Sequence, residues 1–214
     1  HADNYVVNYF GEHSDWRRPF VFLQHGVTKD DLSDWLNLKN IRLLITSTYA
    51  EYSFFTNDKC NYRIPKKHVV LTGFPRHDNL LKVNSRNKQI VIMPTWRSSL
   101  AGSVIKGNHR RKISNFKETN YAKYWSSLLM SPKLKMLKDE YGYQVVFFPH
   151  ANVQPYLDEF AIPSYIKVMD HQTTRIQYLL VNSSILITDY SSIAFDFAYM
   201  NKAVIYYQFD RDTI

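Results

Sequence analysis

The sequence predicts an α/β protein made of two Rossmann-like units, each with a parallel sheet, that face a cleft. Short apolar runs of strand length alternate with stretches of helical pattern along the chain. This alternation is typical of parallel sheets with right-handed crossovers. The apolar runs are continuous, as expected of strands that are covered on both faces. A polar linker at residues 84–88 separates two such series, so we predict domains at residues 1–87 and 88–214.

The first unit is predicted to hold three strands and three helices. Its apolar runs predict strands at residues 20–23, 41–46 and 68–72. Helical stretches follow them at residues 30–38, 47–56 and 78–83. Ser47 or Thr48 is expected to cap the second of these helices.

The second unit repeats the pattern with five apolar runs. These predict strands at residues 89–93, 143–148, 166–169, 185–187 and 203–207. Helices are expected at residues 120–137, with a break or restart at Pro132, at 155–160, at 174–181, and between the last two strands. Residues 100–117 are basic and lack hydrophobic periodicity, which favours a mobile or ligand-facing loop.

Composition and charge limit the class of protein. The chain has 214 residues with an ordinary globular balance, 45% hydrophobic and 21% charged. No apolar run is long enough to span a bilayer, and no signal-peptide pattern is present. A single cysteine, Cys60, excludes an internal disulfide framework and suits a reducing compartment. The net charge of +8 and the pI near 9.4 suit a polyanionic partner, such as nucleic acid, an anionic membrane or a phosphate-rich substrate.

The ends of the sequence suggest a piece of a longer protein. It begins at His1 without a methionine and stops soon after an apolar run. We therefore expect the first unit to lack its start and the second unit to lack its end.

The turn at residues 188–192 joins a predicted strand to a predicted helix. Unpaired backbone N–H groups and the helix dipole favour a phosphate at such a place. Ser191 and Ser192 add hydroxyl donors, and Ser192 shares a helix face with Asp196. An equally good interpretation of this turn alone is that Asp189 or Ser191 only caps the helix.

Other polar residues follow strands, where open α/β sheets bind ligands. His25 and Lys29 lie beside Gly26 after the first strand, although a plain loop with a solvated lysine is the alternative. Arg97 and His150 follow two strands of the second unit. Basic groups, hydroxyls and a helix N-terminus together suit a pyrophosphate, and a histidine can act as a general base.

Metal and cofactor motifs are missing from the sequence. There is no HExxH, no paired CxxC, no Walker A loop and no GxGxxG. The sequence requires no cofactor, and a divalent cation stays possible although no site for it is visible.

Four ordered motifs resemble those of the CDP-glycerol glycerophosphotransferase family, the teichoic-acid primases and polymerases and related capsule-polymer enzymes. The motifs are QHGVTK at 24–29, MPTWR at 93–97, FPHAN at 148–152 and TDYSSIAFDF at 188–197. The resemblance covers almost the whole chain. It implies a GT-B-like fold and transfer of glycerol phosphate, or a related polyol phosphate, from a CDP-polyol to a hydroxyl of a growing polymer, with release of CMP.

The resemblance also implies a set of site residues. His25 and His150 match histidines essential for activity; His25 is assigned as the base and His150 as the group that stabilises charge or assists the leaving group, with the reverse assignment open. The implied donor contacts are Gly26, Val27, Thr28, Lys29, Arg97, Pro149, Ala151, Asp189, Ser191, Ser192 and Asp196.

The partners implied are a CDP-polyol and a lipid-linked or polymeric acceptor. Together with the positive charge, they predict a cytoplasmic protein that lies peripherally on the inner face of the membrane, held partly by anionic lipid. One alternative is a GT-B glycosyltransferase that uses a nucleotide sugar. Another is a basic nucleic-acid-binding module, but no RNP strand, zinc finger or recognition helix is present, so no nucleic acid is expected.

Overall fold

The computed structural model describes residues 20–212, except residues 25, 29, 84, 86, 101, 103, 107 and 108. Contacts divide the chain into two compact units, His1–Pro75 and Arg76–Ile214. This division precedes the polar linker at 84–88 and gives nearly all of helix α4 (Pro75–Lys82) to the second unit. The domain limits predicted at residues 87 and 88 stay a prediction, as does the cleft between the units.

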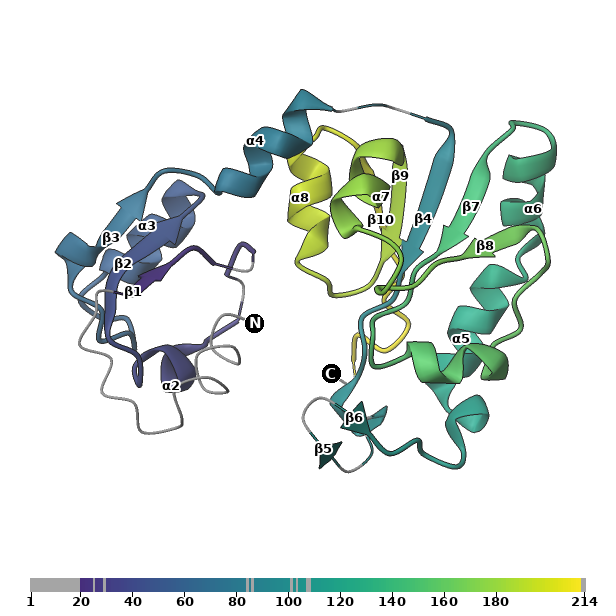
Figure 1. The fold of residues 1–214 in the computed structure, drawn as a ribbon, viewed down its shortest axis with the longest axis horizontal. Helices are drawn as coiled ribbons and strands as arrows, with labels where there is room; N and C mark the ends of the chain where they lie inside the picture. The colour runs from purple at the N-terminus through teal and green to yellow at the C-terminus, as the bar shows by residue number, and fades with distance from the viewer. Residues whose placement is uncertain are drawn as a thin grey trace. The chain divides into compact units, whose positions relative to one another are not determined.

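The first unit contains a three-stranded parallel sheet in the order β1-β2-β3 (Figure 1). The strands are β1 (Phe20–Phe22), β2 (Ile41–Thr46) and β3 (Val69–Leu71), which confirms the three predicted strands. The helices are α2 (Ser33–Leu36), α3 (Tyr49–Thr56) and the 3-10 helix η1 (Lys66–His68). Helix α2 is much shorter than the stretch predicted at 30–38, and α4 begins three residues before the predicted Asp78.

Glu51 fastens the loop after β1 to the start of α3. Thr48 caps α3 as predicted, because its hydroxyl accepts a hydrogen bond from the Glu51 N–H at 3.1 Å. The buried Glu51 carboxylate in turn accepts from the N–H groups of Ser47, at 2.8 Å, and Thr28, at 2.7 Å. Side chains from all three strands and both α-helices form the core: Phe22, Leu36, Ile41, Leu44, Phe55, Tyr62, Ile64 and Val69.

The second unit contains a five-stranded parallel sheet in the order β10-β9-β4-β7-β8 (Figure 1). The strands are β4 (Gln89–Met93), β7 (Gln144–Phe147), β8 (Ile166–Val168), β9 (Ile185–Thr188) and β10 (Ala203–Tyr206), all close to their predicted ranges. The α-helices are α5 (Asn120–Leu129), α6 (Pro132–Asp139), α7 (Ile176–Asn182) and α8 (Ile193–Tyr199). The predicted restart at Pro132 is confirmed, because α6 begins there.

Alternate residues of β4 point to opposite faces of the sheet. Ile90 and Ile92 belong to the core that contains Trp125 of α5 and Leu134 of α6. Val91 and Met93 belong to the core that contains side chains of α4, α7 and α8. The sheet is therefore covered on both faces at β4, which explains why this strand is a nearly continuous apolar run.

The stretch at 100–117 is not the plain loop that was predicted. Its backbone forms the antiparallel pair β5 (Val104–Lys106) and β6 (His109–Arg110). It is flanked by the 3-10 helices η2 (Ser98–Leu100) and η3 (Phe116–Glu118), and η4 (Gln154–Glu159) forms the predicted turn near Pro155. None of the helices in the described residues has the length and apolar character needed to cross a bilayer.

Candidate functional site

The candidate site lies at the carboxyl ends of β4 and β9. The chain leaves β4 through α5 and α6 on one face of the sheet, and it leaves β9 through α8 on the other face. Neighbouring strands whose connections diverge in this way define a topological switch point, where open α/β sheets bind ligands. Thr95 and Arg97 follow β4 at this point, and Asp189 to Ser192 follow β9.

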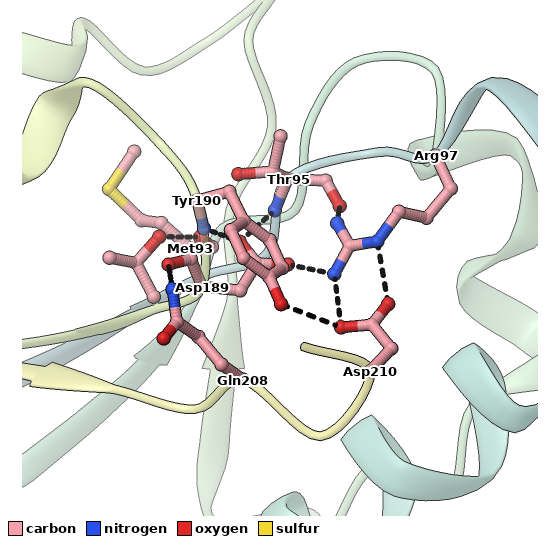
Figure 2. Close-up of polar contacts among 8 residues, drawn as sticks. Met93, Thr95, Arg97, Asp189, Tyr190, Gln208 and Asp210 are labelled. Carbon is pink, nitrogen blue, oxygen red and sulfur yellow. Dashed lines mark hydrogen bonds and ion pairs between the residues drawn. The ribbon is translucent and has the colours of Figure 1, made fainter. Parts of the chain in front are cut away.

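Asp189 is the centre of a polar network between the two strand ends (Figure 2). It is fully buried. Its Oδ1 accepts hydrogen bonds from the N–H groups of Thr95, at 2.9 Å, and Tyr190, at 2.8 Å. Its Oδ2 lies 2.7 Å from Nη2 of Arg97. Asp189 therefore joins the segment after β4 to the segment after β9. Its carboxylate accepts from Thr95 and Tyr190 and not from an N–H group of α8, so the structure does not show the capping that was the alternative for Asp189.

Arg97 is held by two carboxylates and a carbonyl. Its Nε and Nη2 donate to Asp210 at 2.8 and 3.2 Å, and its Nη1 donates to the Thr95 carbonyl at 2.8 Å (Figure 2). The Tyr190 ring lies 4.9 Å from the guanidinium carbon, and its hydroxyl donates to Asp210 at 3.3 Å. Burial lowers the pKa of Arg97, but the Asp210 hydrogen bonds and the Asp189 charge outweigh this effect and raise it.

The network bears on the predicted phosphate contact of Arg97. One guanidinium and the carboxylates of Asp189 and Asp210 sum to a charge of −1, which opposes binding of a further anion. A phosphate can accept hydrogen bonds from Nε and Nη2 of Arg97 only when the Asp210 carboxylate no longer accepts from them. Asp210 was not predicted, although it follows β10 and so obeys the same strand-end rule as the predicted residues.

Ser191 and Ser192 lie in the turn that begins α8, and both are partly exposed. Ser192 is the N-cap residue but makes no side-chain capping bond. The Ser191 Oγ accepts a hydrogen bond from the Ile193 N–H at 3.3 Å. A local capping role is therefore present at Ser191, while the Ser192 hydroxyl has no such role.

Asp196 forms contacts with α4 that were not predicted. Its carboxylate is buried, and its Oδ1 lies 2.7 Å from Arg76 Nη2 and 2.9 Å from His77 Nε2 on α4. The His77 ring also stacks on Tyr199, with centroids 4.4 Å apart. Asp196 thus ties α8 to α4, and its predicted donor contact would require these bonds to be shared or broken.

His150 follows β7, the other neighbour of β4. Its Nδ1 accepts a hydrogen bond from the Asn152 N–H at 3.2 Å, across Ala151. Its ring lies 6.0 Å from the Trp96 ring and 6.3 Å from the His171 ring. Burial lowers the pKa of His150, and the charge of His171 lowers it further. Because an accepting Nδ1 has no proton, the neutral ring carries its proton on Nε2 and donates from there.

His171 was not predicted as part of this region. It lies in the loop after β8, packed against Phe148 with ring centroids 4.3 Å apart. Burial lowers its pKa, although a hydrogen bond with the Pro149 carbonyl opposes this effect. No family motif covers His171, so only its position after a strand could have indicated it.

Three of the predicted residues in the first unit are described by the structure. Gly26 is buried, Val27 is half-buried, and the Thr28 N–H is bound to Glu51. Gln24, two residues after the end of β1, has a φ of 68°, which is uncommon for a residue other than glycine. His25 and Lys29 lie outside the described residues. The described part of the chain holds no group of three or more His, Cys, Asp or Glu residues arranged to bind a metal ion.

Comparison with known proteins identifies the family. Residues 23–213 match the family model described as CDP-Glycerol:Poly(glycerophosphate) glycerophosphotransferase. The protein belongs to this family, as the four motifs predicted.

Relatives and a solved structure agree with this result. The chain is 39% identical over 219 aligned residues to "Minor teichoic acid biosynthesis protein GgaB" of Bacillus subtilis (strain 168), covering 99% of the chain and 24% of GgaB. It is 28% identical over 168 residues to "Teichoic acid poly(glycerol phosphate) polymerase" of Bacillus spizizenii, covering 70% of the chain and 38% of that relative. The structure of the wall teichoic acid polymerase TagF matches 90% of the chain and 46% of its own length, at 20% identity and a TM-score of 0.51, which supports the fold.

Proposed function

We propose that the protein transfers a polyol phosphate, glycerol phosphate in the first instance, from a CDP-polyol to a hydroxyl of a teichoic-acid or capsule-type polymer, releasing CMP. The observation that supports this most is the family match over residues 23–213. The matched segment contains the strand ends that gather Arg97, Asp189, Ser191 and His150 at one edge of the second sheet. The chain covers 24% and 38% of the length of these two curated relatives. The activity proposed here is therefore that of the whole protein.

The proposed reaction is a phosphoryl transfer. The acceptor hydroxyl oxygen attacks the β-phosphorus, which bears the polyol, while the bond from that phosphorus to the bridging oxygen breaks in line. The electron pair of that bond leaves with the CMP oxygen, and a base takes the acceptor proton. Such a reaction needs little covalent chemistry from the protein, so positioning and charge neutralisation dominate.

The structure supports one of the two assignments left open for the histidines. Because Nδ1 of His150 accepts from the Asn152 N–H, the neutral ring carries its proton on Nε2, which suits a donor to a phosphate oxygen and does not suit a base. We therefore assign His150 to stabilising the charge that develops on the leaving phosphate. His25 remains the predicted base on sequence grounds.

We assign Arg97 to binding of the donor diphosphate, whose oxygens would replace the Asp210 carboxylate as its hydrogen-bond acceptors. Arginine binds carboxylates and phosphates with the same planar set of N–H donors, so one can replace the other. Asp189 would keep its contact with Nη2 and hold the guanidinium in place during the exchange. Asp210 is then a positioning residue, because it acts on the donor only through Arg97.

The serine turn gives a direct test of donor binding. We predict that Ser191→Ala combined with Ser192→Ala weakens the affinity for CDP or CDP-glycerol and leaves the fold intact, since both hydroxyls are partly exposed. Calorimetric titration measures the affinity and thermal melting checks the fold. The control is Ser53→Ala combined with Ser127→Ala, two exposed serines elsewhere in the chain. Unchanged affinity in a folded double variant would remove the serines from the donor site.

The acceptor and the location are finer parts of the proposal. We propose a lipid-linked or polymeric acceptor and peripheral attachment to the cytoplasmic membrane face. The charge of +8 supports attraction to anionic lipid. Sedimentation with anionic and neutral vesicles, at low and high salt, tests the attachment, and equal sedimentation with both lipids would contradict it.

A further inference from the structure

A cavity of about 240 Å³ opens in the first unit at the edge of the sheet where β2 and β3 begin. The end of α2, the start of β2 and the segment before β3 form its walls. The strands are parallel, so this edge is opposite to the one where β1 ends and the predicted site residues follow. The cavity is therefore separate from the catalytic edge of this unit.

The cavity is lined by basic side chains without a carboxylate. Lys39, Arg42, Arg63 and His68 all lie on its wall. The two stretches that supply them, residues 35–50 and 59–77, contain no Asp and no Glu. Within the described part of the chain, neither Arg42 nor Arg63 forms an ion pair with a carboxylate. A hollow that is flanked by two arginines without a carboxylate partner among the described residues focuses their field on an anion.

The wall of the cavity is held in place by hydrogen bonds. The Asn37 side chain donates to the Asn61 carbonyl at 2.9 Å and accepts from the Arg63 N–H at 2.7 Å. The His68 Nδ1 lies 3.2 Å from the Ile41 carbonyl. These contacts join the end of α2, the start of β2 and the segment before β3. The cationic groups therefore extend from a fixed frame, which lowers the entropic cost of binding an anion.

We propose that this pocket binds a phosphodiester group of the acceptor polymer, away from the end that reacts. This inference rests on the proposed function, which supplies a polymer with a phosphate in every repeat. Two arginines beside one hollow suit a phosphate, because each guanidinium can donate two parallel hydrogen bonds to it. A second contact would also raise the effective concentration of the polymer at the catalytic edge. The concave shape favours a flexible chain over a flat bilayer, whose headgroups meet protruding surfaces first.

The test compares a charge-removing variant with a matched control in the whole protein. The variant is Arg42→Gln combined with Arg63→Gln, and both side chains are exposed, so folding should survive. The control is Lys123→Gln combined with Lys133→Gln, which removes the same charge from exposed positions of the second unit. The probe is a synthetic glycerol-phosphate oligomer of about ten units, titrated by calorimetry at two salt concentrations.

We expect the variant to bind the oligomer at least about tenfold more weakly, as the loss of more than one charge-assisted hydrogen bond implies. Its affinity should also depend less on salt than that of the control, which should behave as the wild type. Equal affinity of variant and control for the oligomer would overturn the proposal. A variant that loses binding to anionic vesicles but retains the oligomer would also overturn it, in favour of a lipid surface.

A second assay tests the proposed function independently of the pocket. With CDP-glycerol and a short acceptor that carries a single phosphate, the variant should release CMP at the wild-type rate, because such an acceptor cannot contact the pocket and the catalytic edge at the same time. If the wild type releases no CMP at all, the proposed function fails. The oligomer titration still decides whether the pocket binds phosphodiesters.

Discussion

Replacing His150 by alanine should lower CMP release from CDP-glycerol by at least about a hundredfold, the scale typical of a lost proton donor or acceptor. Replacing it by glutamine should restore part of the rate, because the amide N–H can donate a hydrogen bond near the position of Nε2 but cannot accept a proton. The affinity for the donor should change much less than the rate. Stopped assays of CMP release and calorimetry on the whole protein measure the two quantities.

The corresponding variants of His25 separate the two roles. As the predicted base, His25 should lose at least about a hundredfold in rate as alanine and gain nothing as glutamine. Circular dichroism should stay native for all four variants, since both histidines lie outside the apolar runs that predict the strands. A folded His25→Ala protein with near-normal CMP release would end the base assignment. Variants that lose stability but keep their activity per folded molecule would show that the histidines only pack or cap their turns.

Replacing Asp189 by alanine should lower the free energy of unfolding by about 1–3 kcal/mol, the cost typical of leaving a buried hydrogen-bonding group unsatisfied, because Arg97 keeps its pairing with Asp210. The substitution leaves Arg97 without one carboxylate and leaves the N–H groups of Thr95 and Tyr190 without an acceptor. Urea denaturation followed by circular dichroism measures the change. Asp212→Ala is the control, because Asp212 is exposed and lies only two residues after Asp210 of the same network.

Asp210→Asn provides a comparison within the same network. Its side chain is 17% exposed while that of Asp189 is fully buried, so its loss should destabilise the protein less. It should also tighten binding of CDP-glycerol, because it removes the charge that competes with the diphosphate for Arg97. If Asp189→Ala costs less than about 1 kcal/mol and abolishes donor binding instead, Asp189 contacts the donor directly and the structural role is wrong.

The sequence was sufficient for the strands of the two parallel sheets, because each contains a short and mostly apolar run. It also located the strand ends that carry the site, since ligand binding there follows from the topology of parallel sheets. The pairing of Asp196 with His77 could not be predicted, because the two residues are 119 positions apart and meet only through the packing of α8 on α4. The same holds for Asp210, whose bond to Arg97 spans 113 positions.

Other features of the structure were not predicted because the sequence signal for them is short or isolated. The pair β5–β6 has strands of three and two residues, too short to produce an alternating pattern. His171 belongs to no motif, and its closeness to His150 depends on how β8 lies beside β7. The phosphate-binding role of Arg97 was predicted from its position after a strand and from the MPTWR motif, and neither gives information about the carboxylates bound to it in the structure.

The most direct test of the proposed activity is an assay of the whole protein with CDP-glycerol, CDP-ribitol and a nucleotide sugar, each supplied with a glycerol-phosphate acceptor. The nucleotide released and the extension of the acceptor are measured together. A CDP-polyol phosphotransferase should release one CMP for each polyol phosphate added, fastest with CDP-glycerol, and should leave the nucleotide sugar unchanged. Release of a nucleoside diphosphate with transfer of the sugar, and no CMP from either CDP-polyol, would contradict the assignment.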